Sequence, residues 1–447
     1  MSKFVVALYG LLILLHDGSA FTPLPLNKDQ RRHATFQLAS TVQATAAVLT
    51  SEATDIPLSS IRGEADRAFR TGMVLEKNGQ ARAASAAFHE AATLFQCFLD
   101  CGEEFQHVTS LQREEIPGML AYTAVRLAHL SHDALGDSKA AYRLYREAGT
   151  IDPTPSAVSF DGMGTALEAS FGNLSEAVPC YRQAHKMRPN NRLFLFHLAV
   201  ALERLGEVEE SEQLMEILRR SELRHSCLVD SWGYVRWHTR KQNPNNLHRG
   251  TRDMLQIALD AAQPLLGKNN LVCEFGVASG RSLRMTQELL PLDVIEIHGF
   301  DTFTGLPQAW GNEPAGSYST GGVVPDMEQG KVYFHKGLFR HTIPRFLESQ
   351  PEDAVLAYAN IDCDLYTSTL EILESMYDRI VPGTVLVFDE YLCHATWRQD
   401  EFRAFRECCK RFGWNYEYLA FSLSTKQAVV RITSQLGVGS VSQSQGR

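Results

Sequence analysis

The stretch Ala354-Val-Leu-Ala-Tyr-Ala-Asn-Ile361 decides the fold of the C-terminal half, because it is an apolar run that ends abruptly in Asp362-Cys-Asp364. A second apolar run, Thr384 to Phe388, ends in Asp389-Glu390. Near-continuous apolar runs of this length are typical of strands buried on both faces of a parallel sheet. The carboxyl ends of such strands meet at one edge, which holds the ligands in open α/β sheets. We therefore expect the four carboxylates to share one site.

A glycine-containing turn lies upstream. Leu271 to Phe275 reads as a strand that breaks into Glu274-x-Gly276-x-Ala278-x-Gly280, with a helix expected from about Ser282. Glycines let the backbone approach a ligand closely, and a helix N-terminus offers free N–H groups. Asp301 ends the next apolar strand, roughly two dozen residues after Gly276, the separation at which an acid binds ribose hydroxyls. The turn lacks the Gly-x-Gly-x-x-Gly pattern, which counts against NAD and favours S-adenosylmethionine (SAM).

The order of elements in this half predicts a doubly wound sheet. Strands are expected near residues 270, 296, 332, 355 and 384, alternating with helices, one of which covers Phe402 to Arg411. Trp414 to Phe421 and Gln427 to Ile432 read as a closing hairpin that supplies an antiparallel edge. Alternation of strands and helices is the pattern of α/β folds.

A different architecture precedes the sheet. A glycine, a small residue five positions on, a bulky residue at nine and a further side chain at twelve recur four times, with successive glycines from Gly136 on about 34 to 36 residues apart. The sets are Gly79/Ala84/Phe88/Ala91, Gly136/Ala141/Tyr145/Ala148, Gly172/Ala177/Tyr181/Ala184 and Gly206/Ser211/Met215/Leu218. This period predicts an all-α tetratricopeptide solenoid over residues 60–224. In such a solenoid, neighbouring repeats stack and bury apolar side chains that a single repeat would leave exposed. The first interval is longer, and we assign the excess to residues 96–117.

The segment from about Asp230 to Ile432 resembles the macrocin O-methyltransferase family of metal-dependent class I methyltransferases. The motifs that carry the resemblance are Glu274-Phe-Gly-Val277, Gly299-Phe-Asp-Thr-Phe-Thr-Gly-Leu-Pro307, Gly337-Leu-Phe-Arg-His-Thr-Ile-Pro344, Asp362-Cys-Asp-Leu-Tyr366 and Pro382-Gly-Thr-Val-Leu-Val-Phe-Asp-Glu390. The resemblance implies a Rossmann-like domain over residues 225–435. It also implies methylation of a hydroxyl on a sugar or another small oxygenated metabolite.

Roles for individual residues follow from the same resemblance. SAM contacts are expected from Glu274, Gly276, Ser279, Gly280, Asp301, Thr302, Phe303 and Gly337. Asp362, Asp389 and Glu390 are the expected ligands of Mg²⁺, a cation that prefers oxygen ligands and keeps waters. Asp364 is the expected general base. The family more often has two aspartates where this chain has Asp389-Glu390. Because glutamate is longer by one methylene group, this difference leaves the identity of the metal open, and not the binding of a metal.

Other interpretations stand beside this one. Taken alone, Asp389-Glu390 also suits solvated charges at a strand end or a helix cap, and Asp362 and Asp364 suit an Asx turn. A competing class of function is a scaffold whose repeats bind a protein partner while the methyltransferase fold is catalytically silent. An NAD-dependent oxidoreductase ranks last. The broken stretch from Leu306 to Gly330 is expected to be a lid or binding loop, in which an aromatic residue such as Trp310 shields the reactants from water. The alternative is a disordered surface insertion.

The N-terminus predicts targeting. Lys3, the apolar run from Phe4 to Leu15 and Gly18-Ser-Ala20 are typical of a signal peptide over residues 1–20. The acid-poor tract 21–58 has transit-peptide composition, so we expect delivery to a plastid through the secretory route, with the secretory lumen as the alternative. The nine cysteines lack disulfide-framework spacing. The Ser/Gln/Gly tail, residues 436–447, is expected to be disordered.

Composition bounds the partners. The formal net charge of −9 argues against bulk affinity for nucleic acid or anionic membranes. The N-terminal apolar run is too short to span a bilayer stably. The expected partners are therefore a small-molecule hydroxyl substrate and, through the repeats, a protein.

Overall fold

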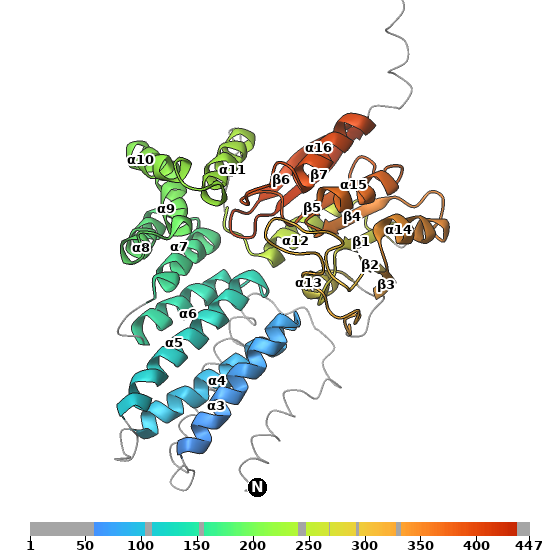
Figure 1. Ribbon diagram of the computed structural model, residues 1–447. Coiled ribbons are helices and arrows are strands. Elements are labelled where there is room, and N and C mark those ends of the chain that lie inside the picture. Colours follow the sequence, from blue (N-terminus) through green and yellow to red (C-terminus); the bar gives the residue numbers. More distant parts are fainter. Residues whose placement is uncertain are drawn as a thin grey trace, which may run out of the picture. The chain divides into compact units, whose positions relative to one another are not determined.

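The computed structural model describes residues 58–102, 110–151, 156–239, 247–267, 269–291, 295–327 and 332–435 (Figure 1). By its contacts the chain divides into two units, Met1–Ser60 and Ile61–Arg447, and the second contains nearly all of the described residues. The predicted signal peptide, the transit-like tract up to residue 57 and the C-terminal tail lie outside the described residues. Within the described part of the chain, no helix is both long and apolar enough to cross a membrane.

The first half of this unit is helical, as predicted. Its helices are α3 (Leu58–Lys77), α4 (Ala81–Gly102), α5 (Ser110–Asp133), α6 (Ser138–Ile151), α7 (Ala157–Phe171), α8 (Leu174–Met187), α9 (Arg192–Leu205), α10 (Val208–Arg219) and α11 (Leu223–Thr239). Helices α4 and α5 contain 22 and 24 residues, against 14 in α6 and α8. The excess length in the first predicted repeat therefore includes extra helical turns.

The repeat pattern has a direct structural cause. Gly172 and Gly206 end α7 and α9 with φ of 62° and 94°, a left-handed conformation that glycine adopts without a steric penalty. A Cβ added at Gly162 would lie 2.4 Å from Cζ of Tyr145, and one at Gly164 would lie 2.5 Å from Cε1 of Tyr181. The bulky residues of the pattern thus pack directly against the backbone of α7.

The second half contains the predicted sheet. Its elements are α12 (Thr251–Ala262), β1 (Leu271–Phe275), α13 (Arg281–Leu289), β2 (Ile297–Asp301), β3 (Val332–Lys336), α14 (Phe339–Glu348), β4 (Leu356–Ile361), α15 (Tyr366–Ser375), β5 (Val385–Phe388), α16 (Glu401–Phe412), β6 (Trp414–Phe421) and β7 (Ala428–Gln435). The strand order is β3-β2-β1-β4-β5-β7-β6. Strands β1 to β5 pair in parallel, whereas β7 is antiparallel to both β5 and β6. The expected doubly wound sheet with an antiparallel edge hairpin is confirmed.

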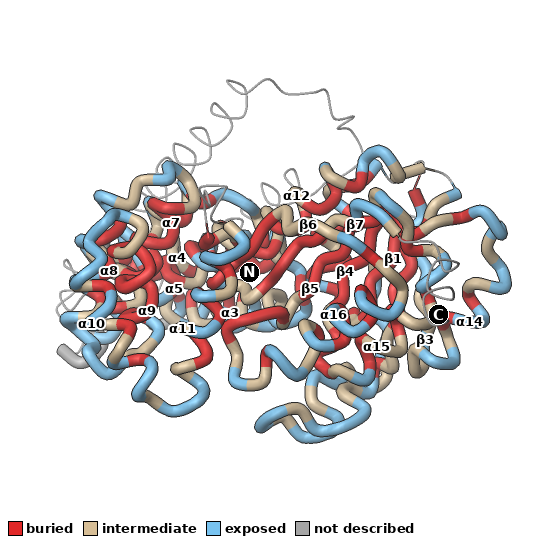
Figure 2. The backbone as a smooth tube through the Cα atoms, turned by 90° about the horizontal axis from the view of Figure 1, so that it is seen from above, coloured by how far each residue is buried: buried red, intermediate tan, exposed pale blue. Residues whose placement is uncertain are grey.

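Both faces of the sheet are covered. Strand β1 places Cys273 and Phe275 in one hydrophobic cluster and Val272 in another, as the two-residue period of a strand requires. The first cluster contains residues of α14, α15 and α16, and the second contains residues of α12 and α13. Figure 2 shows the central strands as buried segments. Burial on both faces explains why β5 is entirely apolar and why β4 is apolar except at Asn360.

Candidate functional site

A cavity of about 640 Å³ opens at the carboxyl ends of the parallel strands, where the sequence places the candidate residues. The predicted site residues that line it are Gly276, Asp301, Thr302, Gly337, Asp362, Asp364, Asp389 and Glu390. Strand order explains this gathering, because β2, β1, β4 and β5 are consecutive neighbours in the sheet. Glu274, Ser279, Gly280 and Phe303 are not among the lining residues.

The turn after β1 is built around Gly276. Its φ is 89°, and a Cβ added there would lie 1.6 Å from the carbonyl oxygen of Asp362, so the backbones of the two motifs are in contact. The Asp301 carboxylate accepts hydrogen bonds from the backbone N–H of Val277 (2.8 Å) and Ala278 (2.7 Å) through Oδ2. Asp301 therefore fixes the turn as well as facing the cavity.

Glu274 lies beneath this turn. The side chain is buried, accepts a hydrogen bond from Ser282 Oγ at 2.9 Å and lies 3.4 Å from Nδ2 of Asn360. Burial, opposed by these two hydrogen bonds, raises the pKa of Glu274 to about 8. Glu274 thus joins β1 to the start of α13 and to β4, a supporting position beneath the cavity floor.

The remaining predicted SAM residues hold the neighbouring loops. Gly280 begins α13 with φ of 79°, and Arg284 donates a hydrogen bond to the Ser279 carbonyl at 2.7 Å. The Phe303 side chain is buried, and its carbonyl accepts from Gly322 N–H at 2.7 Å. Gly337 donates its N–H to the Asp301 carbonyl at 2.9 Å.

The acidic wall faces the turn. Asp362 and Asp389 directly follow the neighbouring strands β4 and β5. Burial raises the pKa of Asp362 well above its usual range, and repulsion from Asp389 and Asp364 adds to the effect. Burial and the charge of Asp389 raise the pKa of Asp364 to about 7. Asp364 has φ of 59°, which is rare for a residue with a side chain and is typical of functional sites.

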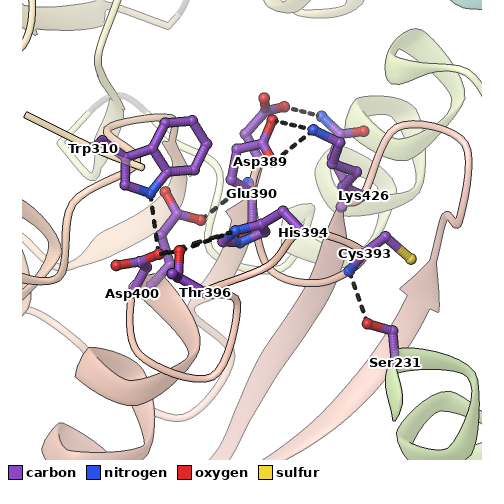
Figure 3. A network of polar contacts seen from close by, with 11 residues as sticks. Ser231, Trp310, Asp389, Glu390, Cys393, His394, Thr396, Asp400 and Lys426 are labelled. Carbon is purple, nitrogen blue, oxygen red and sulfur yellow. Dashed lines mark hydrogen bonds and ion pairs between the residues drawn. The ribbon is translucent and has the colours of Figure 1, made fainter. Parts of the chain in front are cut away.

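Glu390 has a partner that the sequence did not indicate. Lys426 Nζ lies 3.1 Å from each carboxylate oxygen of Glu390 (Figure 3). The next residue, Gln427, is buried and donates from Nε2 to Oδ1 of Asp389 at 2.5 Å. Both come from the loop between β6 and β7. Because β7 pairs antiparallel with β5, the loop before β7 lies beside Asp389 and Glu390, which follow β5. The predicted closing hairpin could therefore have pointed to Lys426 and Gln427.

A fifth carboxyl group was also missed. Glu401, the first residue of α16, is buried, and its oxygens accept from the backbone N–H of Cys363 (3.4 Å) and Glu390 (3.2 Å). Burial raises the pKa of Glu401 well above its usual range, and the charges of Asp364 and Asp389 act in the same direction. Glu401 connects the two acidic motifs through their backbones.

The expected metal geometry is incomplete in the structure. Over the described residues, no three His, Cys, Asp or Glu side chains are grouped in a way that could hold a metal ion. Asp362, Asp389 and Glu390 do line one cavity, but the Glu390 carboxylate pairs with Lys426.

The loop expected to be a lid contributes a different aromatic residue. Trp310 donates from Nε1 to Oδ2 of Asp400 at 3.0 Å and packs against His394, with ring centroids 5.4 Å apart (Figure 3). Trp310 is not a lining residue, whereas Tyr318 lines the cavity and is 57% exposed. The sequence could not indicate which aromatic residue of the loop lines the cavity, because a loop without periodicity does not reveal its path.

Comparison with known proteins agrees with this geometry. Residues 324–411 match the family model "Macrocin-O-methyltransferase (TylF)", and residues 156–228 match a tetratrico peptide repeat model. No curated protein matches the chain.

Similar solved structures include the calicheamicin methyltransferase CalS11 and the O-methyltransferase NovP. CalS11 is 23% identical, with 50% of this chain and 93% of that chain covered and a TM-score of 0.33. NovP is 21% identical, with 41% and 78% covered and a TM-score of 0.31. Because these scores are low, the assignment depends on the family models.

The family model over residues 324–411 identifies a methyltransferase, a class whose methyl donor is SAM, and the doubly wound sheet with its antiparallel hairpin agrees with that class. Within that class, residues 324–411 are similar to the macrocin O-methyltransferase family, and the preceding residues 156–228 are similar to tetratricopeptide repeats.

Proposed function

We propose that this protein transfers a methyl group from SAM to a hydroxyl group of a sugar or a similarly oxygenated small molecule. The observation that carries the proposal is that the glycine turn and the carboxylates line one and the same cavity. A volume of about 640 Å³ falls within the range of small-molecule sites.

The turn side suits the cofactor. Gly276, Asp301, Thr302 and Gly337 line the same space. An acid at the end of the second strand is placed to accept hydrogen bonds from ribose hydroxyls. These residues would hold SAM, which would supply the methyl group as an electrophilic sulfonium substituent.

The acidic side suits proton removal from the acceptor. In the reaction the acceptor oxygen bonds to the methyl carbon, the carbon–sulfur bond breaks, and S-adenosylhomocysteine leaves with the electron pair on sulfur. The hydroxyl proton must pass to a base. Asp364 lines the cavity and has its pKa raised to about 7, which matches a general base to neutral pH.

The finer part of the proposal is a divalent cation, Mg²⁺, bound by Asp362, Asp389 and Glu390. Two of these residues fit it, because the Asp362 carboxylate is buried beside Asp389, and the charge of Asp389 raises the pKa of Asp362 further, a repulsion that a cation would relieve. Glu390 fits only if it exchanges Lys426 for the metal. A bound divalent cation supplies acidification and orientation of the acceptor hydroxyl.

Two further parts of the proposal concern partners and location. Tetratricopeptide segments suggest interaction with a protein, and we propose that residues 60–224 bind one. Delivery to a plastid remains a proposal from the composition of residues 1–58.

The deciding experiment is calorimetric titration of the whole chain with SAM and S-adenosylhomocysteine, each in Mg²⁺ and in EDTA. Micromolar binding supports the proposal and leads to a screen of sugars with labelled methyl donor. Folded protein that binds neither compound under any condition would overturn it. Loss of methyl transfer, but not of SAM binding, in EDTA would support the metal.

A further inference from the structure

Backbone hydrogen bonds, as well as side chains, hold the loop between β6 and β7, residues 422–427, against the segment that follows β5. The Lys426 carbonyl accepts hydrogen bonds from the backbone N–H of Tyr391 (3.1 Å) and Leu392 (3.2 Å), directly after Glu390. Lys426 has φ of 61°, so its backbone is in the strained left-handed region. The position of this loop therefore sets where Lys426 and Gln427 meet Glu390 and Asp389.

The other side of the same loop is bound to residues 247–249, which precede α12. Leu423 donates its N–H to the Leu247 carbonyl at 2.8 Å, and Ser422 Oγ donates to the Arg249 carbonyl at 2.7 Å. Between them, Nδ1 of His248 lies 2.8 Å from Oγ of Ser424, within hydrogen-bond distance.

His248 is at the same time packed among polar residues of the repeat helices. Its buried ring lies edge-on to the ring of His197, with centroids 5.0 Å apart, and Nε2 lies 3.6 Å from Oε1 of Glu168. His197 Nδ1 is 2.9 Å from the Asp161 carboxylate, and Tyr181 donates to Glu168 at 2.9 Å. Polar groups buried this deeply are rigid because each lost partner is costly.

We propose that His248 is a positioning residue, which transmits the placement of the repeat helices α7 to α9 to the loop 422–427 and so to the Asp389–Glu390 pair. Its imidazole is the one side chain that contacts both Ser424 and Glu168 among those described above. The consequence for turnover rests on the proposed methyl transfer, whereas the mechanical coupling does not.

Two pairs of variants test this role. Ser424→Ala removes the hydroxyl that meets His248, and Ser211→Ala is the matched control, because Ser211 Oγ donates to the Ala199 carbonyl at 2.7 Å within the repeats. His248→Gln displaces the polar atom from the Nδ1 position, whereas His248→Asn keeps an amide near it.

The primary measurement is hydrogen exchange of the peptide that contains Tyr391 and Leu392. We expect Ser424→Ala and His248→Gln to speed its exchange about fivefold, the effect of losing roughly one hydrogen bond. His248→Asn should restore slow exchange relative to His248→Gln, and Ser211→Ala should leave it unchanged. Thermal unfolding recorded alongside separates this local effect from general destabilisation.

Unchanged exchange at Tyr391 and Leu392 in Ser424→Ala and His248→Gln would overturn the inference. The same conclusion would follow if all four variants sped exchange equally along the chain. Calorimetry of the unaltered protein with SAM runs beside these measurements. Failure to bind SAM would remove the proposed function while the exchange pattern still decides the coupling, so the two failures are distinguishable.

Discussion

At the scale of single residues, the site concentrates negative charge that folding alone would avoid. Asp362, Asp364, Asp389, Glu390 and Glu401 each have a raised pKa whose first cause is burial. Removing a carboxylate from water is costly unless it is paired. Such an arrangement opposes stability, and functional sites commonly trade stability for activity in this way.

SAM binding and metal-stimulated methyl transfer should respond to different mutations. Asp362→Asn removes one proposed ligand of the cation, so we expect it to abolish metal-stimulated methyl transfer and to leave the Kd for SAM within about twofold. It also removes one repelling charge, so the melting temperature should rise by a few degrees. Asp301→Ala loses the acceptor for the turn's N–H groups and should weaken SAM binding at least tenfold. Calorimetry and thermal unfolding measure both. Equal loss of SAM affinity in two folded variants would contradict separate cofactor and metal sites.

Glu274 gives a prediction about pH. Its folded pKa of about 8 lies above the ordinary value, so the folded state holds a proton that the unfolded state releases. Stability should therefore be greatest below the unfolded pKa and fall as pH rises toward about 8, with a slope of at most ~1.4 kcal/mol per pH unit from this group.

Glu274→Gln removes that titration while keeping the shape of the side chain. We expect its unfolding free energy, measured by urea denaturation from pH 5 to 9, to decline less steeply than that of the unaltered protein. Parallel pH profiles for the two proteins would mean that Glu274 does not carry the buried proton.

Residue-level prediction from the sequence succeeded where backbone topology alone brings residues together. Asp362 and Asp389 follow apolar strands, and adjacent parallel strands leave their ends side by side. Lys426, Gln427 and Glu401 were missed because their positions depend on how a hairpin and a helix return to the sheet. The sequence also did not indicate that Tyr318, rather than Trp310, lines the cavity, because a long loop has no periodicity that predicts its path.

At the scale of elements, the two kinds of periodicity in the chain were sufficient to define the fold. Five apolar runs became β1 to β5, and the closing pair became β6 and β7. The recurring glycines adopt positive φ where helices end, and the bulky residues Tyr145 and Tyr181 of the pattern pack against glycines of α7. Helix boundaries moved by a residue, as at Arg281, because local capping rather than hydrophobic pattern decides them.

Close packing in the repeats can be tested with two glycines that lie inside helices. Gly162→Ala places a methyl group against the Tyr145 ring and should destabilise the protein by about 1–3 kcal/mol through overpacking. Gly149→Ala meets no atom within 4 Å and should be neutral or stabilise α6 by up to about 1 kcal/mol. Chemical denaturation measures both. A harmless Gly162→Ala would show that α6 and α7 have room to separate.

At the scale of the whole molecule, the sheet and the repeat helices share their cores within the unit Ile61–Arg447. One cluster contains Phe196 and Met215 together with Phe388 and Trp397. The other contains Phe88 with Val272 and Ile297. Each face of the sheet is therefore continuous with apolar side chains of the array, so the two halves depend on each other for burial.

This continuity predicts cooperative unfolding. The whole chain should melt in one transition by calorimetry, with equal van't Hoff and calorimetric enthalpies. A fragment of residues 222–435 should melt at a lower temperature, because it exposes apolar surface that the repeats cover in the intact protein. Two separate transitions in the whole chain, one matching that of the fragment, would indicate independent halves.

The loop that leaves β2 at Asp301 and returns to the sheet at β3 has a consequence for how this protein can change. Strand β3 is an edge strand, so the chain there pairs on one side only. Insertions and exchanges in residues 306–327 would leave the ladder between β2 and β3 intact while replacing Pro307, Gln308 and Tyr318 in the cavity wall. New acceptor preferences are thus accessible by loop exchange, with the catalytic framework inherited unchanged.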